Sequence, residues 1–148
     1  MEQADWVQQA EQALDYGVMG ILILMSIVAL WLFIERLMFY KSIRLDDYES
    51  RDLLELDLSD NLSTISAIGA NAPYIGLLGT VLGIMITFYT LGDTGPVDAK
   101  KIMVGLALAL KATAMGLIVA IPAISFYTIA LRKMERIVAH FDAQNEKS

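Results

Sequence analysis

The sequence predicts an all-α integral membrane protein with three transmembrane helices, and three observations carry this prediction. Hydrophobic residues make up 56% of the 148-residue chain. The mean hydropathy of +0.53 is well above that of a soluble domain. Three long apolar stretches alternate with charged segments, and each stretch is long enough to cross a bilayer as a helix. The chain length fits a single membrane domain over residues 1–148.

The same composition argues against several classes of function. The chain has no cysteine, and its one histidine, His140, lies in a polar tail, so we expect no disulfide and no metal site. A formal charge of −6 argues against nucleic-acid binding, which needs a basic face. No nucleophile–base pair and no phosphate-binding loop can be recognised. We therefore expect a protein that is not an enzyme and that needs no cofactor.

The first span is predicted at residues 16–34. This run of 19 uncharged residues would cover roughly 28 Å as a helix, about the thickness of the hydrocarbon core. Glu35-Arg36 closes the run. The preceding residues 3–15 place apolar side chains at helical spacing and carry no basic residue. This pattern predicts a short amphipathic helix at the membrane surface and does not fit a cleaved secretory signal.

The second span is predicted at residues 73–91, after a polar cytoplasmic segment over residues 35–72. The uncharged run here, residues 61–92, is longer than one span needs, and its first third is polar. Pro73 fits either the first turn of the second membrane helix or a kink in a longer one.

The third span is predicted at residues 102–122, after a periplasmic turn over residues 92–101. Starting it only after Lys111 would leave nine consecutive nonpolar residues outside the membrane, so we place Lys111 near mid-bilayer. The helix should continue in the cytoplasm to about residue 141. Steps of 11 residues inward from Leu91 and Ile102, which flank the turn, reach Thr80 and Thr113, so these hydroxyls are expected at one depth on antiparallel neighbours.

The basic residues predict the orientation. Eight of the eleven lie in residues 35–60 and 132–148, whereas none precedes residue 16. The excess of Lys and Arg in cytoplasmic loops places the N-terminus outside and the C-terminus in the cytoplasm.

Small residues recur on the second and third spans, where they let helix backbones approach closely. The candidates for packing or kinking are Gly76, Gly79, Gly83, Gly116, Pro73 and Pro122. Plain helix packing explains the glycines, but their number exceeds what one small protomer needs, so we also expect a homo-oligomer. Pro122 deprives one carbonyl of its usual donor, which is either a tolerated kink or a binding point for water, a hydroxyl or another subunit.

Three polar residues inside the predicted spans are candidates for function. Thr80 and Thr113 can bond the carbonyl four residues earlier in their own helices, and the sequence alone favours that simple role. Lys111 costs on the order of 2.5–3.5 kcal/mol at a helix centre, so it needs an acidic partner, a wet cavity or an unusually long reach to the interface. No acidic residue lies inside the three predicted spans, so a titrating carboxylate would have to come from another chain.

Two sequence blocks resemble the ExbB/TolQ/MotA family of proton-driven motor subunits. Residues 72–85 read Ala-Pro-Tyr-Ile-Gly-Leu-Leu-Gly-Thr-Val-Leu-Gly-Ile-Met, and residues 112–123 read Ala-Thr-Ala-Met-Gly-Leu-Ile-Val-Ala-Ile-Pro-Ala. The second block is similar to ExbB and TolQ in particular, and Glu35-Arg36 fits as well. The resemblance covers all three spans.

The resemblance implies a homo-pentameric ring in the bacterial inner membrane around a dimer of a one-span partner, ExbD or TolR. The partner's intramembrane aspartate would carry the proton past threonines at the positions of Thr80 and Thr113, and the resulting rotation would work on TonB and outer-membrane import.

The sequence departs from the family pattern in two places. The family usually carries a glutamate at the position of Leu108, and Lys111 is an added cation one turn away, which we expect to pair with the partner's aspartate. The segment between the first two spans is also short. A TolQ-like subunit of the Tol-Pal envelope system is the near alternative, a MotA-type flagellar stator is a more distant one, and a structural scaffold without ion flow is the alternative from another class.

Overall fold

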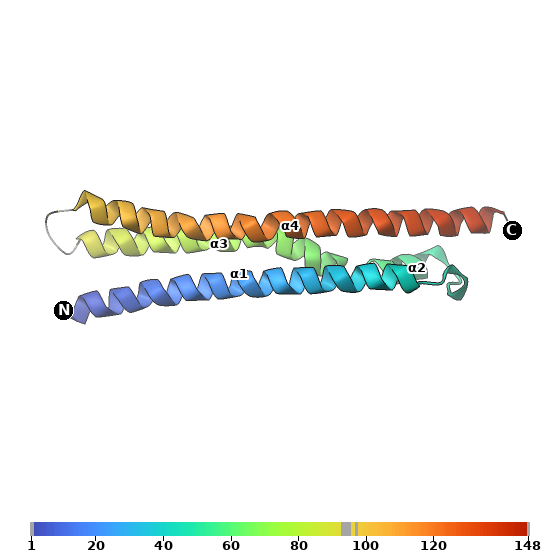
Figure 1. Ribbon diagram of the computed structural model, residues 1–148, viewed down its shortest axis with the longest axis horizontal. Helices are drawn as coiled ribbons and strands as arrows, with labels where there is room; N and C mark the ends of the chain where they lie inside the picture. The colour runs from blue at the N-terminus through green and yellow to red at the C-terminus, as the bar shows by residue number, and fades with distance from the viewer. Residues whose placement is uncertain (1, 93–95, 97, 148) are drawn as a thin grey trace. The chain divides into compact units, whose positions relative to one another are not determined.

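The computed structural model describes residues 2–92, 96 and 98–147, and this part of the chain is almost entirely helical. Figure 1 shows the elements in order: α1 (Glu2–Ser42), the 3-10 turn η1 (Leu45–Asp47), α2 (Arg51–Leu58), α3 (Leu62–Gly92) and α4 (Ala99–Glu146). Helices α1, α3 and α4 are each long and apolar enough to cross a membrane. The predicted all-α fold with three membrane-spanning helices is confirmed.

The helices are longer than the spans expected from the sequence. Helix α1 runs without a break through the boundary expected between residues 15 and 16, so the amphipathic segment and the first span form one helix. Pro73 lies inside α3 and not in its first turn, which selects the longer helix of the two alternatives. Helix α4 passes through Pro122 and continues to Glu146, somewhat beyond the expected end near residue 141.

The expected turn at residues 92–101 is only partly described, because residues 93–95 and 97 lie outside the described part of the chain. After it, Asp98 caps the start of α4. Its carboxylate accepts a hydrogen bond from the backbone N–H of Lys100 at 3.0 Å, and its carbonyl accepts one from Lys101 at 3.1 Å. Such caps satisfy N–H groups that have no partner within the helix.

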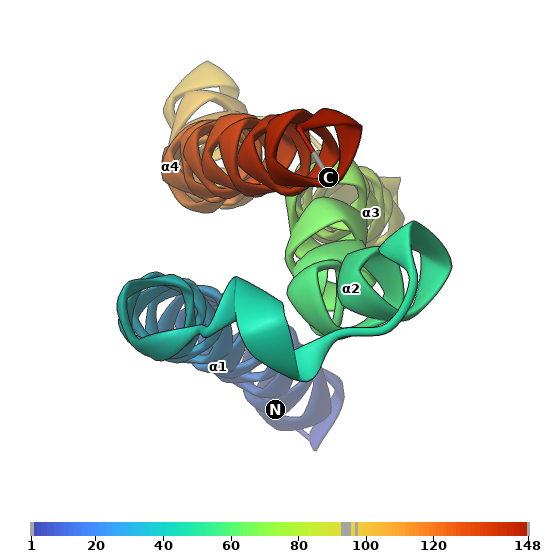
Figure 2. The same cartoon turned by 90° about the vertical axis from the view of Figure 1, so that its right-hand side faces the viewer.

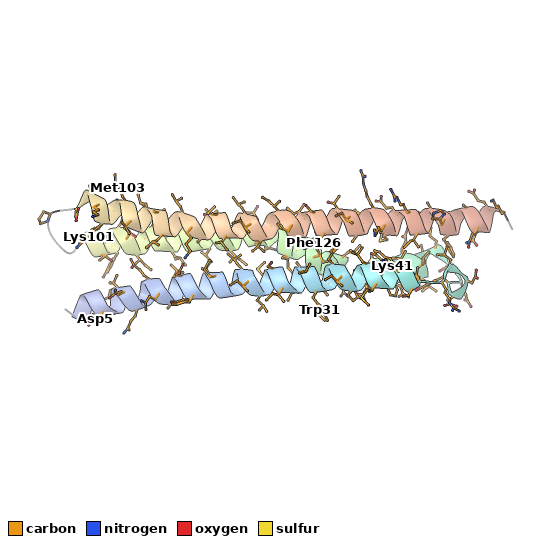
Figure 3. The ribbon with its side chains drawn as sticks, in the orientation of Figure 1. Asp5, Trp31, Lys41, Lys101, Met103 and Phe126 are labelled. Atoms are coloured by element: carbon orange, nitrogen blue, oxygen red, sulfur yellow. The ribbon has the colours of Figure 1, made fainter. Side chains whose placement is uncertain are left out.

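Large apolar side chains point outward along all three long helices. Trp31, for example, is 66% exposed and Met103 is 69% exposed, and both project away from their helices in Figure 3. A soluble protein rarely leaves so much apolar surface in contact with water. Lipid is the natural environment of these faces, and the protein is a membrane protein.

The described residues fall into two compact units. Residues of Met1–Met25 and Ala70–Ala120 form the first, and residues of Ser26–Gly69 and Ile121–Ser148 form the second. The second unit has an apolar core to which all four α-helices contribute. Its buried members are Leu32, Tyr40, Leu54, Leu58, Leu62, Ile65, Ala130, Val138 and Phe141.

Short helix α2 completes this core. Ser50 caps it by accepting a hydrogen bond from the N–H of Leu53, and Leu54 and Leu58, four residues apart on one face, are fully buried. Figure 2 shows α2 beside the start of α3. Within the same unit, Phe126 points inward from α4 and stacks on Phe33 of α1 with ring centroids 4.5 Å apart (Figure 3).

Side chains from α1 hold the end of α2. Arg36 is only 4% exposed and donates to the carbonyl of Asp57 at 2.7 Å, while the Tyr40 hydroxyl donates to the carbonyl of Leu58 at 2.6 Å. The last carbonyls of a helix have no partner within it, so these two bonds satisfy groups that would otherwise be buried unpaired. Asn61 follows in a left-handed conformation with φ of 67° and donates to Glu35 at 3.2 Å.

Replacing Tyr40 by phenylalanine should destabilise the second unit by about 1–3 kcal/mol, because the buried Leu58 carbonyl loses its donor. Tyr48→Phe is the matched control. Its hydroxyl donates to Asp57 at 2.8 Å in an exposed position, so the loss should be about 1 kcal/mol or less. The midpoint of thermal unfolding in detergent measures both. Equal shifts for the two variants would contradict the greater importance of the buried bond from Tyr40 to the Leu58 carbonyl.

Candidate functional site

Helices α3 and α4 approach each other most closely at two glycines of the first unit. A Cβ on Gly76 would lie 2.6 Å from the carbonyl oxygen of Ala112, and one on Gly116 would lie 2.7 Å from that of Ala72. The same Cβ on Gly76 would also lie 3.1 Å from the Cα atom of Gly116. Only glycine permits backbones to meet at this distance, so these two residues set the separation of the two helices.

Gly79 and Gly83 extend the same contact. A Cβ on Gly79 would lie 2.9 Å from the Ala112 side chain and 3.2 Å from Val18 of α1, so α1 also packs here. One on Gly83 would lie 3.1 Å from the Ala109 side chain. Gly105, which the sequence did not single out, also belongs to this contact, because a Cβ there would come within 2.6 Å of the Thr87 hydroxyl. A glycine opposite a threonine on the neighbouring span was the available signal.

The close approach brings Thr80 and Thr113 together. Their hydroxyls share a short hydrogen bond across the α3–α4 contact. The Thr80 hydroxyl also lies 2.8 Å from the carbonyl of Ala109 on α4 and 3.3 Å from the carbonyl of Gly76 in its own helix. The own-helix carbonyl and the two cross-helix oxygens therefore all lie within hydrogen-bond distance of Thr80.

The hydrogen bonds of this pair can be arranged in two ways. Thr80 is 6% exposed and has one hydrogen for three oxygen neighbours, whereas Thr113 is partly exposed. If Thr80 donates to Ala109, then Thr113 donates to Thr80 and keeps lone pairs free to accept from outside. If Thr80 donates to Thr113, the Thr113 hydrogen is available to an outside acceptor. The pair can thus present an acceptor or a donor without any movement of heavy atoms.

Lys111 has an acidic neighbour within its own chain. Its Nζ atom lies 3.7 Å from Oδ2 of Asp15 on α1, and each side chain is 47% exposed. Asp15 directly precedes the expected first span, so its place in the sequence did not connect it with Lys111. A lysine side chain on a helix leans toward the N-terminus of that helix, so its ammonium can meet an acid nearer that end than its own backbone position suggests.

A cavity of about 670 Å³ opens between α1, α3 and α4 in the first unit. Asp15 lines it together with Leu108, Ala109 and Ala112 of α4. The carbonyl of Ala109 also accepts the bond from Thr80, so this wall of the cavity is shared with the hydroxyl pair. Leu108, which stands where the resemblance leads one to expect a glutamate, supplies no charge to it.

The two prolines do not contribute polar groups to this site. Pro73 is half-buried inside α3, and Pro122 is exposed inside α4. No group of three or more potential metal ligands occurs among the described residues.

The arrangement defines the class of protein: a helical membrane protein whose spans meet tightly enough to bury a polar hydroxyl pair and to bring a charge pair together among apolar surfaces. Comparison with known proteins names the family. The model of the MotA/TolQ/ExbB proton channel family matches residues 31–143, and the chain belongs to this family. The family resemblance of the two sequence blocks is confirmed.

Several relatives are similar over most of their length. The chain is 52% identical over 132 residues to the putative biopolymer transport protein ExbB-like 2 of Helicobacter pylori, covering 89% of this chain and 88% of that protein. It is 47% identical over 137 residues to the biopolymer transport protein ExbB of Aquifex aeolicus, covering 93% of each. A shorter match to ExbB of Pseudomonas putida, 38% identical over 78 residues, covers 53% of this chain and 24% of that protein.

Gly76→Ala should weaken the α3–α4 contact by about 1–3 kcal/mol, because the added methyl group collides with backbone that cannot move aside without separating the helices. Gly20→Ala is the matched control. Nothing lies within 4 Å of a Cβ at that position of α1, and alanine is the better helix former by about 1 kcal/mol. Thermal unfolding in detergent should therefore rank Gly76→Ala below the wild type and Gly20→Ala at or above it.

Proposed function

We propose that this chain is the ring-forming subunit of an ExbB-type complex that harvests the proton-motive force in a bacterial inner membrane. The observation that carries the proposal is the hydroxyl pair of Thr80 and Thr113 at the α3–α4 contact. Membership of a proton channel family and the naming of relatives as biopolymer transport proteins support it.

The mechanism that we propose needs a second polypeptide. An ExbD-like protein with one span and an intramembrane aspartate would stand against Thr113. An aspartic acid must donate a hydrogen bond and an aspartate must accept one. Because the threonine pair can present either an acceptor or a donor, it can hold the partner's carboxyl in both protonation states. Proton exchange at this point would then cost little hydrogen-bond energy in either state, which a site of repeated proton transfer requires.

The assembly of the complex and its orientation in the membrane belong to the same proposal. Five protomers would surround the partner's helices, with the N-terminus in the periplasm and the C-terminus in the cytoplasm, as the distribution of basic residues indicates. Motion of the partner relative to the ring would be passed to a TonB-like protein and used for import across the outer membrane. No chemical bond of a substrate is made or broken in this cycle.

Thr113→Val should reduce proton flux by about tenfold or more, because the hydroxyl of this partly exposed residue is lost, and each 1.4 kcal/mol of lost interaction is a factor of about ten. Thr113→Ser should keep most of the flux, since serine retains the hydroxyl. Thr128→Val is the matched control. Its hydroxyl bonds the carbonyl of Ile124 in its own helix, at an exposed position, and the flux should not change.

The measurement is proton uptake by vesicles that contain the tagged chain purified together with its co-purifying one-span partner. Normal flux in a correctly assembled Thr113→Val complex would favour a structural scaffold over a proton channel. Loss of flux combined with unchanged outer-membrane import, but with a defect in cell constriction, would favour the Tol-Pal role.

A further inference from the structure

The ion pair between Asp15 and Lys111 is not used by the proposed proton pathway. It joins α1 to α4 inside the first unit, with 3.7 Å between the charged atoms. An unpaired lysine in an apolar helix region is expensive, and a carboxylate at this distance compensates its charge. The pair therefore gives Lys111 a resident counter-ion within its own chain.

The pair and the hydroxyls lie on different sides of α4. Lys111 and Thr113 are two positions apart, and residues so spaced on a helix do not face the same way. Thr113 faces Thr80 on α3, whereas the Lys111 ammonium reaches Asp15 on α1. Between them in sequence, Ala112 lines the same cavity as Asp15. The charge pair is thus adjacent to the hydroxyl pair but directed away from it.

We propose that Asp15 is a positioning residue for proton transfer. Its carboxylate compensates the positive charge of Lys111 and holds the lysine ammonium on the α1 side of α4. This inference rests on the function proposed above. Without Asp15, an uncompensated cation would stand within one helical turn of Thr113. A cation at that distance in a medium of low dielectric disfavours protonation of a nearby carboxyl. The partner's aspartate would then take up protons poorly at this point.

The cavity supplies polar neighbours to the acidic half of the pair. Beside Asp15 it carries the polar side chains of Gln8, Glu11 and Gln12 from α1 and of Thr87 from α3. The cavity, of about 670 Å³, has room for water that can hydrogen-bond these polar groups.

The rival assignment is that Lys111 pairs with the partner's aspartate, as the sequence suggested. The two assignments predict opposite outcomes for Asp15→Asn and for the double variant Asp15→Asn/Lys111→Met. If Asp15 is the counter-ion, Asp15→Asn should reduce proton flux by about tenfold, and the double variant Asp15→Asn/Lys111→Met should restore it to within about threefold of the wild type because both charges are gone. Asp15→Glu should also retain flux, because it keeps the negative charge.

If Lys111 serves the partner, Lys111→Met should be the most damaging single change, Asp15→Asn should be nearly silent, and the double variant should be as poor as Lys111→Met. That ranking would overturn the proposal. Glu11→Gln is the matched control, because it removes a carboxylate from the same cavity without touching the pair. It should leave the flux unchanged, and a loss equal to that of Asp15→Asn would also count against the proposal.

A second experiment tests the geometry without reference to proton flux. The chain has no cysteine, so Asp15→Cys/Lys111→Cys can be treated in native membranes with a short bis-maleimide cross-linker. We expect efficient intramolecular cross-linking of this pair. The control Gly17→Cys/Lys111→Cys should cross-link much less, because residue 17 lies two positions further along α1. Residue 17 is also exposed, and nothing lies within 4 Å of a Cβ there.

Equal cross-linking of the two pairs would overturn the assigned contact, whatever the flux data show. The two failures are distinguishable. A wild-type complex that carries no protons would end the proposed function while leaving the cross-link intact, whereas an absent cross-link in a complex that carries protons would end only the role of Asp15.

Discussion

The contact of α3 with α4 at Gly76 and Gly116 is the constraint on which the site depends. Backbone atoms at these residues approach to a distance that no side chain allows. Within a bilayer, helix association gains little from the hydrophobic effect, so close van der Waals contact and cross-helix hydrogen bonds must supply it. Here the close contact makes the cross-helix hydrogen bonds possible, because the short separation of the helices brings the Thr80 hydroxyl within reach of both Thr113 and the Ala109 carbonyl.

Polar groups of the described helices find partners close by, as an apolar environment requires. Thr80, Thr87 and Thr128 bond the carbonyl four residues earlier in their own helices. Of these three, Thr80 also bonds across to another helix. Lys111 meets Asp15. Two of the three polar residues that the sequence singled out are therefore joined to each other, and the third is held by an acid of its own chain.

In the second unit, side chains of α1 donate hydrogen bonds to the end of α2, where water would otherwise do so. Arg36 and Tyr40 bond the last carbonyls of α2, and α2 in turn buries Leu54 and Leu58. The short segment between α1 and α3 is therefore packed, because α2 places its buried leucines in the apolar core of this unit. The short connection between the first and second spans is therefore ordered structure with its own packing, not a mere linker.

The class of fold could be predicted from the sequence, because hydrophobic run length is a local property and lipid permits few backbone structures. The family could be predicted for a similar reason, since its two blocks are contiguous in the chain. The equal distance of Thr80 and Thr113 from the turn between their helices predicts one depth for both hydroxyls, whereas their direct hydrogen bond depends on the packing of α3 against α4.

Only the tertiary structure decided which residues that lie far apart in the sequence come into contact. Asp15 lay just outside a span boundary drawn from hydropathy, so nothing in the sequence connected it with a lysine 96 positions later. Gly105 looked like any other small residue until Thr87 was found against it. Pro73 fitted two helix lengths equally well, because proline restricts its own φ but does not say how many residues precede it in the helix. Run length and composition along the chain set the spans, whereas rotation of each helix about its axis and its register against its neighbours depend on packing between distant residues.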